Sequence, residues 1–221
     1  MEKKKITIIG AGMMGSALAF PAAENGHEVH IVGTCLDDKI IDGYLATGKH
    51  EKFCRPFPEN VNYHYFKDWK TVVEGSDFVI GGVSSFGVDW FLEEILIQLD
   101  PEMPVLSVTK GLRATDDGSL LSYPGYWMSE LAKRGIHRDI CAVGGPCTSY
   151  ELVFKDPTEV AFCGWDNEVL RMMKQAMQRP YYHISLTNDV IGLESAVALK
   201  NAYAMAVTLA VGLNIRWHGE E

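Results

Sequence analysis

Lys200 carries the only formal charge between residues 195 and 215, in a run of Ala, Val, Leu, Met and Tyr residues that predicts a buried helix. An ammonium group in such surroundings loses hydration, and desolvation lowers the pKa of a lysine. A lysine with a lowered pKa can act as a general base near neutral pH. Two other interpretations of Lys200 stay open on this residue alone: a side chain that reaches the surface along its apolar stem, or a structural ion pair.

A glycine-rich segment is the second candidate for chemistry. The sequence Gly10-Ala-Gly12-Met13-Met14-Gly15 follows a predicted strand over residues 5–9 and opens a predicted helix over residues 16–24. In this context the first glycine permits a tight turn, the second lets the backbone approach a pyrophosphate, and the third allows close helix–strand packing. The helix N-terminus adds amide donors and a positive dipole end. The segment therefore predicts a dinucleotide-binding loop.

The residues after the second predicted strand, 27–32, do not select between NAD and NADP. An NAD-selective site carries Asp or Glu there for the ribose, but this strand ends in Gly33 and Thr34. No arginine stands there for a 2′-phosphate either, and Asp37 and Asp38 come a few residues late. Thr34 can hydrogen-bond the ribose or be an ordinary strand-end residue.

Further polar turns follow other predicted strands. Lys110 ends one strand beside a glycine, where it can meet an anion or a substrate oxygen, although a solvated strand-end lysine is the alternative. Residues 144–149, Gly-Gly-Pro-Cys-Thr-Ser, form another such turn. Cys147 has no histidine near it in sequence, so it does not by itself indicate a nucleophile. Carboxyl ends of parallel strands meet at one sheet edge, so we expect these turns to line a common crevice.

Strands and helices alternate along most of the chain. Strands are predicted at residues 5–9, 27–32, 77–83, 104–109, 140–143, 159–163 and 182–186. Helices are predicted at residues 16–24, 71–74, 90–99, 119–134 and 167–178, and residues 35–68 are expected to be loops with a short helix. This order predicts an α/β fold with a doubly wound, mostly parallel Rossmann-type sheet. We expect a dinucleotide-binding domain at residues 1–187 and the first helix of an incomplete helical substrate domain at residues 188–221.

Composition narrows the functional classes. The 221 residues are 47% hydrophobic and 22% charged, as in ordinary soluble proteins, and the net charge of −9 argues against a nucleic-acid partner. Five cysteines without a CxxC pair suggest neither a disulfide framework nor a metal site, and they fit a cytoplasmic location. The long apolar stretch includes Glu194 and Lys200, which are costly in lipid, so no membrane span is expected.

Five motifs occur in order and at suitable separations. They are Gly10-Ala-Gly12-x-x-Gly15, Val108-Thr109-Lys110-Gly111, Gly144-Gly145-Pro146, the segment 187–194, and Ala198-Leu199-Lys200-Asn201-Ala202. Together they resemble the NAD(P)-dependent glycerol-3-phosphate dehydrogenases, over nearly the whole chain from Lys4 to about Leu213. The Thr-Lys-Gly and Leu-Lys-Asn motifs are far more specific than the glycine loop.

The resemblance implies a reaction and roles for individual residues. Glycerol 3-phosphate and dihydroxyacetone phosphate would be interconverted by hydride transfer with NAD or NADP. The implied roles are Lys200 as proton acceptor, Lys110 at both cofactor and substrate, Met13 and Met14 at the pyrophosphate, Thr34 at the adenosine ribose, Gly145 and Cys147 at the substrate, and Ser149 at the cofactor. Three positions depart from the usual pattern: Ser84 replaces a common proline, Cys147 a Ser or Thr, and Ser149 an alanine.

In this family the helical domain extends beyond the position of Glu221, with an aspartate that assists the lysine and an Arg-Asn pair for the substrate phosphate. The sequence is therefore expected to be either a piece of a longer enzyme or a shortened relative. Two other functions remain open: a related Rossmann dehydrogenase of a small hydroxy acid, and a non-catalytic nucleotide-binding fragment. We expect the apolar face of the final helix to be covered by the missing part of the enzyme or by a second subunit, and the second possibility predicts a homodimer.

Overall fold

Eight strands form one sheet in the order β10-β9-β8-β5-β4-β1-β2-β3, in a computed structural model that describes residues 2–116 and 118–218. The strands are β1 (Lys5–Ile9), β2 (Glu28–Val32), β3 (Val61–His64), β4 (Phe78–Gly81), β5 (Val105–Ser107), β8 (Ile140–Gly144), β9 (Thr158–Cys163) and β10 (Tyr182–Thr187). Neighbours from β3 to β8 are parallel, whereas β9 runs antiparallel to β8. The expected doubly wound, mostly parallel sheet is confirmed.

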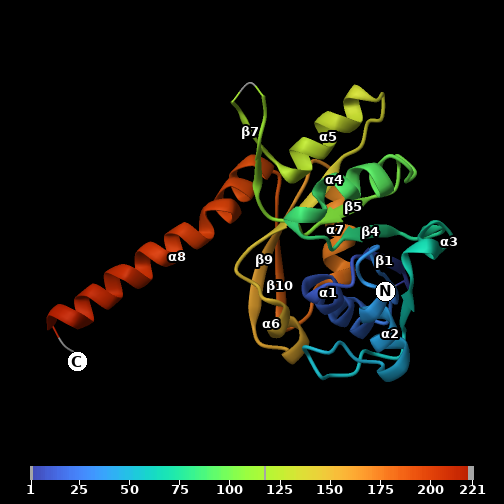
Figure 1. The fold of residues 1–221 in the computed structure, drawn as a ribbon, viewed down its shortest axis with the longest axis horizontal. Coiled ribbons are helices and arrows are strands. Elements are labelled where there is room, and N and C mark those ends of the chain that lie inside the picture. Colours follow the sequence, from blue (N-terminus) through green and yellow to red (C-terminus); the bar gives the residue numbers. More distant parts are fainter. Residues whose placement is uncertain (1, 117, 219–221) are drawn as a thin grey trace.

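Helices connect the strands and cover the sheet (Figure 1). They are α1 (Met13–Glu24), α2 (Asp38–Thr47), α3 (Trp69–Val73), α4 (Val88–Phe91) with a π-helical turn at Leu92–Leu96, α5 (Tyr123–Lys133), α6 (Ser149–Phe154), α7 (Asn167–Met177) and α8 (Val190–His218). The chain leaves β1 toward β2 and β3, then returns to β4 on the other side of β1. This reversal leaves a crevice at the carboxyl ends of β1 and β4, where ligands bind in such sheets.

The central strands are apolar because the sheet is covered on both faces. Ile6 and Ile8 belong to one buried cluster, with α1, α6 and α7, and Ile9 belongs to a second cluster with α4 and α5. All three isoleucines are fully buried. Burial on both faces explains why β1 has a continuous apolar run instead of an alternating pattern.

Two sequence expectations about elements were wrong. Residues 35–68 contain the strand β3 as well as α2, because Val61–His64 extends the sheet beside β2. Residues 119–134 are not one helix: β6 (Leu112–Ala114) and β7 (Leu120–Ser122) form a hairpin, and α5 begins only at Tyr123. The Ser122 hydroxyl accepts a hydrogen bond from the Gly125 amide at this start, and a proline is tolerated in a first helical turn.

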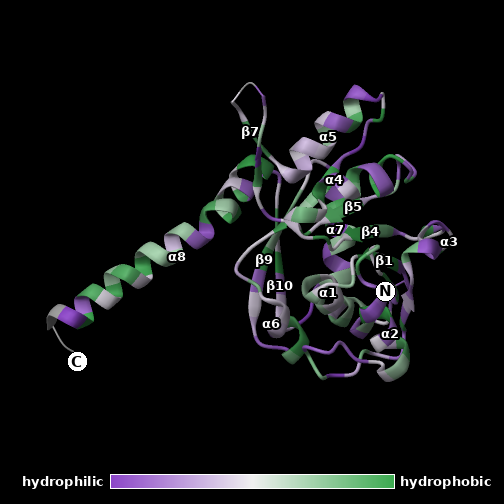
Figure 2. Cartoon of the chain, in the orientation of Figure 1, coloured by the Kyte–Doolittle hydropathy of each residue, from purple (hydrophilic) through white to green (hydrophobic). Residues whose placement is uncertain are grey.

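The expectation that the final helix is buried was also wrong for most of its length. The first turns of α8 pack against β8, but residues 201–216 are exposed, and the helix extends away from the sheet (Figure 1). Hydrophobic residues occur along this exposed part (Figure 2). By length and composition, the segment Val190–Arg216 could cross a membrane. A single helix of this kind is weak evidence for a membrane span, because core helices of soluble proteins can have the same length and composition.

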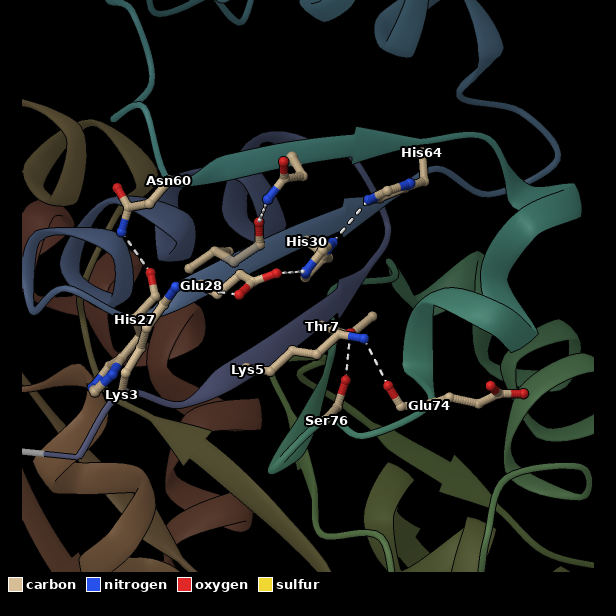
Figure 3. Close-up of polar contacts among 12 residues, drawn as sticks. Lys3, Lys5, Thr7, His27, Glu28, His30, Asn60, His64, Glu74 and Ser76 are labelled. Atoms are coloured by element: carbon tan, nitrogen blue, oxygen red, sulfur yellow. Dashed lines mark hydrogen bonds and ion pairs between the residues drawn. The ribbon is translucent and has the colours of Figure 1, made fainter.

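Polar side chains from the neighbouring strands β1, β2 and β3 lie close together (Figure 3). His30 lies between Glu28 and His64: its Nε2 is 3.0 Å from Glu28 Oε1, and its Nδ1 is 2.9 Å from His64 Nε2. Nearby, the Thr7 and Ser76 hydroxyls are 2.7 Å apart. Burial lowers the pKa of both His30 and His64, so this group of side chains favours neutral imidazoles.

Candidate functional site

A cavity of about 580 Å³ opens at the carboxyl ends of the central strands. Its walls come from four segments that are far apart in sequence, together with Trp90 of α4: the glycine loop after β1, residues 34–37 after β2, residues 82–87 after β4 and residues 108–110 after β5. This is the predicted crevice at the topological switch point. It brings together six predicted site residues, namely Gly10, Gly12, Met13, Met14, Thr34 and Lys110.

The glycine loop has the backbone that the sequence predicts. Gly10 has a φ of +113°, and a Cβ there would lie 2.8 Å from the carbonyl carbon of Gly82. A Cβ on Gly15 would lie 2.2 Å from the Gly10 oxygen, so only glycine lets α1 pack this closely. In contrast, a Cβ on Gly12 would meet nothing within 4 Å, because this position faces the cavity.

Gly12 is also the N-cap of α1 and supplies no capping side chain. The first amide groups of α1, at Met13 and Met14, are therefore left for a ligand at the positive end of the helix dipole. An open surface at Gly12 next to uncapped amides is what a pyrophosphate requires. The residues present therefore fit a dinucleotide.

Asp37 reaches the end of β2 although it lies late in sequence. The chain turns after Thr34, with the Asp37 amide donating to the Thr34 carbonyl at 3.0 Å. Asp37 Oδ2 then accepts hydrogen bonds from the Thr34 amide and hydroxyl, both at 2.8 Å, and from the Ala11 amide at 3.1 Å. The turn therefore places a carboxylate beside the glycine loop, which strand-end position alone did not reveal.

Lys110 links the cavity to the second group of predicted residues. Its Nζ donates to the carbonyl oxygen of Gly145 at 3.2 Å, and its side chain is half-buried. Burial is the main factor that lowers the pKa of Lys110, and the nearby charge of Lys200 lowers it further. The two lysines are thus close enough for their charges to interact.

Lys200 lies on α8 and is half-buried, not deeply buried as the sequence suggested. Its position depends on the contact between α8 and the end of β8. A Cβ on Gly144 would lie 2.6 Å from Leu193 Cγ and 2.8 Å from Val197 Cγ2. Gly144 therefore allows α8 to approach the sheet closely.

The remaining predicted residues follow β8. Gly145 has a φ of +143° and directs its carbonyl to Lys110. Cys147 is buried, and burial raises the pKa of its thiol to about 11, so it is protonated at neutral pH and is not an activated nucleophile. Ser149 is buried at the start of α6 and is not among the residues that line the cavity.

Glu194 is a second residue whose importance the sequence did not reveal. It is 1% exposed, and neither carboxyl oxygen has a hydrogen-bond partner among the described residues. Burial raises the pKa of Glu194 to about 7, while the charge of Lys110 acts in the opposite direction. An isolated acidic residue in an apolar helix is the signal that could have identified it.

Comparison with known proteins agrees with this arrangement. The chain is 31% identical over 211 residues to an NADP(+)-dependent glycerol-3-phosphate dehydrogenase of Archaeoglobus fulgidus. The aligned region covers 96% of this chain and 62% of the relative. Solved structures of glycerol-3-phosphate dehydrogenases from Plasmodium falciparum (TM-score 0.82, 22% identity, 96% and 60% coverage) and Coxiella burnetii (TM-score 0.79, 23% identity, 96% and 62% coverage) share the fold.

The chain spans about 60% of the length of these relatives. Residues 5–170 match the family described as NAD-dependent glycerol-3-phosphate dehydrogenase N-terminus. The resemblance found in the sequence is thereby confirmed, and the relatives support NAD or NADP as cofactor. The chain belongs to the NAD-dependent glycerol-3-phosphate dehydrogenase family.

Proposed function

We propose that this chain supplies the dinucleotide-binding domain and the lysine pair of an enzyme that interconverts glycerol 3-phosphate and dihydroxyacetone phosphate. One observation carries the proposal: Lys110 lines the cavity beside the glycine loop and also interacts with the charge of Lys200. A cofactor site and a candidate proton acceptor are thus adjacent.

Each residue then has a defined task. Met13, Met14 and Thr34 line the cavity, which supports roles for the first two amides at the pyrophosphate and for Thr34 at the adenosine ribose. The nicotinamide ring, when bound, supplies the acceptor or donor of the hydride. Lys110 orients the substrate oxygen, while Lys200 Nζ takes the hydroxyl proton and returns it to the ketone in the reverse direction.

The substrate side of the site is part of the same proposal. Gly145 and Cys147 stand beside Lys110, where a small phosphorylated substrate would lie. Ser149 was expected at the cofactor, but its burial away from the cavity lining gives that role no support. All five cysteines are free, which supports a cytoplasmic location. The apolar side chains exposed on α8 support a homodimer, which size-exclusion chromatography of the 221-residue chain would test.

Replacement of Lys200 tests the proposal. We expect Lys200→Ala to lower turnover of dihydroxyacetone phosphate with reduced dinucleotide by roughly 10²-fold or more, the usual contribution of a positioned acid–base group. Dinucleotide affinity, measured by fluorescence titration, should stay close to that of the wild type. Lys133→Ala is the matched control, because Lys133 is an exposed lysine on α5.

The other outcomes separate the alternatives. A near-normal rate for Lys200→Ala in the complete protein would show that another group takes the proton. Wild-type turnover of small hydroxy acids in preference to glycerol 3-phosphate would favour a related dehydrogenase. Tight dinucleotide binding without oxidation of any alcohol, in the complete natural protein, would favour a non-catalytic nucleotide-binding module.

A further inference from the structure

Glu194 is a buried acid that the proposed proton transfer does not use. It lies on α8 at 1% exposure, and neither carboxyl oxygen has a hydrogen-bond partner within the described part of the chain. Buried carboxylates with a structural role are normally paired or hydrogen-bonded, because an isolated charge is expensive in an apolar interior. An unpaired buried acid next to a candidate active site is therefore a candidate for a functional role, and its neighbours indicate which one.

The contact between α8 and the end of β8 determines those neighbours. Leu193 covers Gly144 so closely that a Cβ on the glycine would lie 2.6 Å from Leu193 Cγ. The next residue along the chain, Gly145, accepts the hydrogen bond from Lys110 Nζ at 3.2 Å. Glu194 follows Leu193 into this contact, and its charge interacts with that of Lys110. The buried carboxyl group and the amine of Lys110 thus belong to one cluster.

The other titratable groups of the cluster are thiols. Cys163 on β9 interacts with Glu194, and Cys147 interacts with Lys110. Burial raises the pKa of Cys163 to about 12 and that of Cys147 to about 11, so both thiols are uncharged at neutral pH. Asp189, just before α8, is exposed. Among the described residues, Glu194 is therefore the buried carboxylate that acts on Lys110.

Glu194 and Lys200 act on Lys110 in opposite directions. Burial is the largest factor that lowers the pKa of Lys110, and the charge of Lys200 lowers it further, whereas the charge of Glu194 raises it. Without the carboxylate, Lys110 would give up its proton more easily. A neutral Lys110 would no longer be a charge-assisted donor to a substrate oxygen.

We propose that Glu194 is a positioning residue that keeps Lys110 in its charged form beside Lys200, so that Lys110 holds the substrate oxygen while Lys200 exchanges the proton. This inference rests on the proposed function and adds a residue to it. Glu194 acts through Lys110 and contacts neither substrate nor cofactor. The stability that a buried carboxylate costs is then the consequence of a functional requirement.

Competitive acetylation of the 221-residue chain with acetic anhydride, followed by peptide mass spectrometry, tests the inference without any measurement of turnover. Only the neutral amine of a lysine reacts, so the pH midpoint of labelling reports its ionisation. We expect Glu194→Gln to lower the midpoint of Lys110 by about 0.5 pH unit or more, which is roughly a threefold change in its proton equilibrium. Lys133 on α5 is exposed and serves as the internal reference.

Two further variants separate charge from shape and position. Glu59→Gln is the matched control, because it removes the same charge from an exposed residue just before β3. It should leave the Lys110 midpoint at its wild-type value. Glu194→Asp keeps the negative charge in a shorter side chain, and it should retain a higher Lys110 midpoint than Glu194→Gln does.

The same pair can be measured from the side of the acid. In Lys110→Met the carboxyl group of Glu194 loses the positive charge that lowers its pKa. Its titration, followed by NMR of the chain with ¹³C-labelled glutamate side chains, should therefore move to a higher pH than in the wild type.

Several results would overturn the inference. An unchanged Lys110 midpoint in folded Glu194→Gln, or an equal shift in Glu59→Gln, would show that Glu194 does not control the charge of Lys110. If Glu194→Gln failed to fold by circular dichroism, an unchanged titration of Glu194 in Lys110→Met would overturn the inference instead. The proposed function fails separately, if the wild type binds neither NADH nor NADPH in a fluorescence titration, whatever the lysine midpoints are.

Discussion

At the scale of single residues, the buried acid on α8 has the clearest energetic consequence. An ionised carboxylate without a hydrogen-bond partner is expensive inside a protein, and the group responds by holding its proton. Glu194 is in this state, since burial raises its pKa from an ordinary 4.5 to about 7. The positive charge of Lys110 recovers part of the cost, but it does not restore an ordinary pKa.

Glu194 should therefore lower the stability of the chain as the pH rises. The unfolded chain releases this proton near pH 4.5 and the folded chain near pH 7. The free energy of unfolding is therefore highest below pH 4.5 and falls as the pH rises from 4.5 to 7. We expect Glu194→Gln to be more stable than the wild type by about 3 kcal/mol at pH 8.5 and by less than about 1 kcal/mol at pH 5. Urea unfolding of both proteins at the two pH values measures the difference. A difference that does not depend on pH would contradict the assigned pKa.

At the scale of elements, the sequence pattern predicted those strands and loops whose conformation depends on residues close together in the chain. The apolar strand β1 and the glycine loop were predicted because their pattern reflects burial and backbone conformation within a few residues. β3 was missed because only one of its four residues, Val61, is buried, and pairing with β2 is what makes this segment a strand. The approach of Asp37 to Ala11 depends on how β1 and β2 align, which sequence spacing does not encode.

The contact between α8 and β8 is an element-scale feature with its own test. Gly144→Ala would place a methyl group within 2.6 Å of Leu193, so α8 must shift or the strand must deform. We expect a loss of about 1–3 kcal/mol in the free energy of unfolding, the usual cost of overpacking. Denaturant unfolding by circular dichroism would detect this loss.

Gly43→Ala is the control for that substitution. Gly43 lies within α2, and a Cβ there would meet nothing within 4 Å. Since alanine favours helix over glycine, Gly43→Ala should raise stability by about 0.5–1 kcal/mol. Equal stability of Gly144→Ala and the wild type would mean that α8 does not need close contact with β8.

At the scale of the whole molecule, the site exists only because the sheet brings distant segments together. The sequence predicted a common crevice from the rule that parallel strands end at one edge, and the cavity confirms that Gly10, Thr34 and Lys110 share it. What it did not predict is burial: Lys200 was expected to be enclosed, but much of α8 is exposed. Burial depends on every neighbouring element, so an apolar run alone does not determine it.

Four histidines give the whole molecule a second response to pH, opposite in sign to that of Glu194. Burial is the largest factor that lowers the pKa of His27, His30, His50 and His64 below the ordinary 6.5. The unfolded chain therefore binds protons at a higher pH than the folded chain does. Stability that is fully present above pH 6.5 is lost as the pH falls toward the lower folded pKa values.

Glu194→Gln separates the two responses, because it removes the acidic group whose titration overlaps that of the histidines. In this variant we expect the midpoint of thermal unfolding to fall steadily from pH 7.5 to pH 5. The wild type should show a smaller change, since protonation of Glu194 offsets the loss over the same range. His64→Gln on the Glu194→Gln background should reduce the slope, because it removes one imidazole whose pKa is lowered in the folded chain. A midpoint that rises as the pH falls in Glu194→Gln would show that the histidines do not resist protonation in the folded chain.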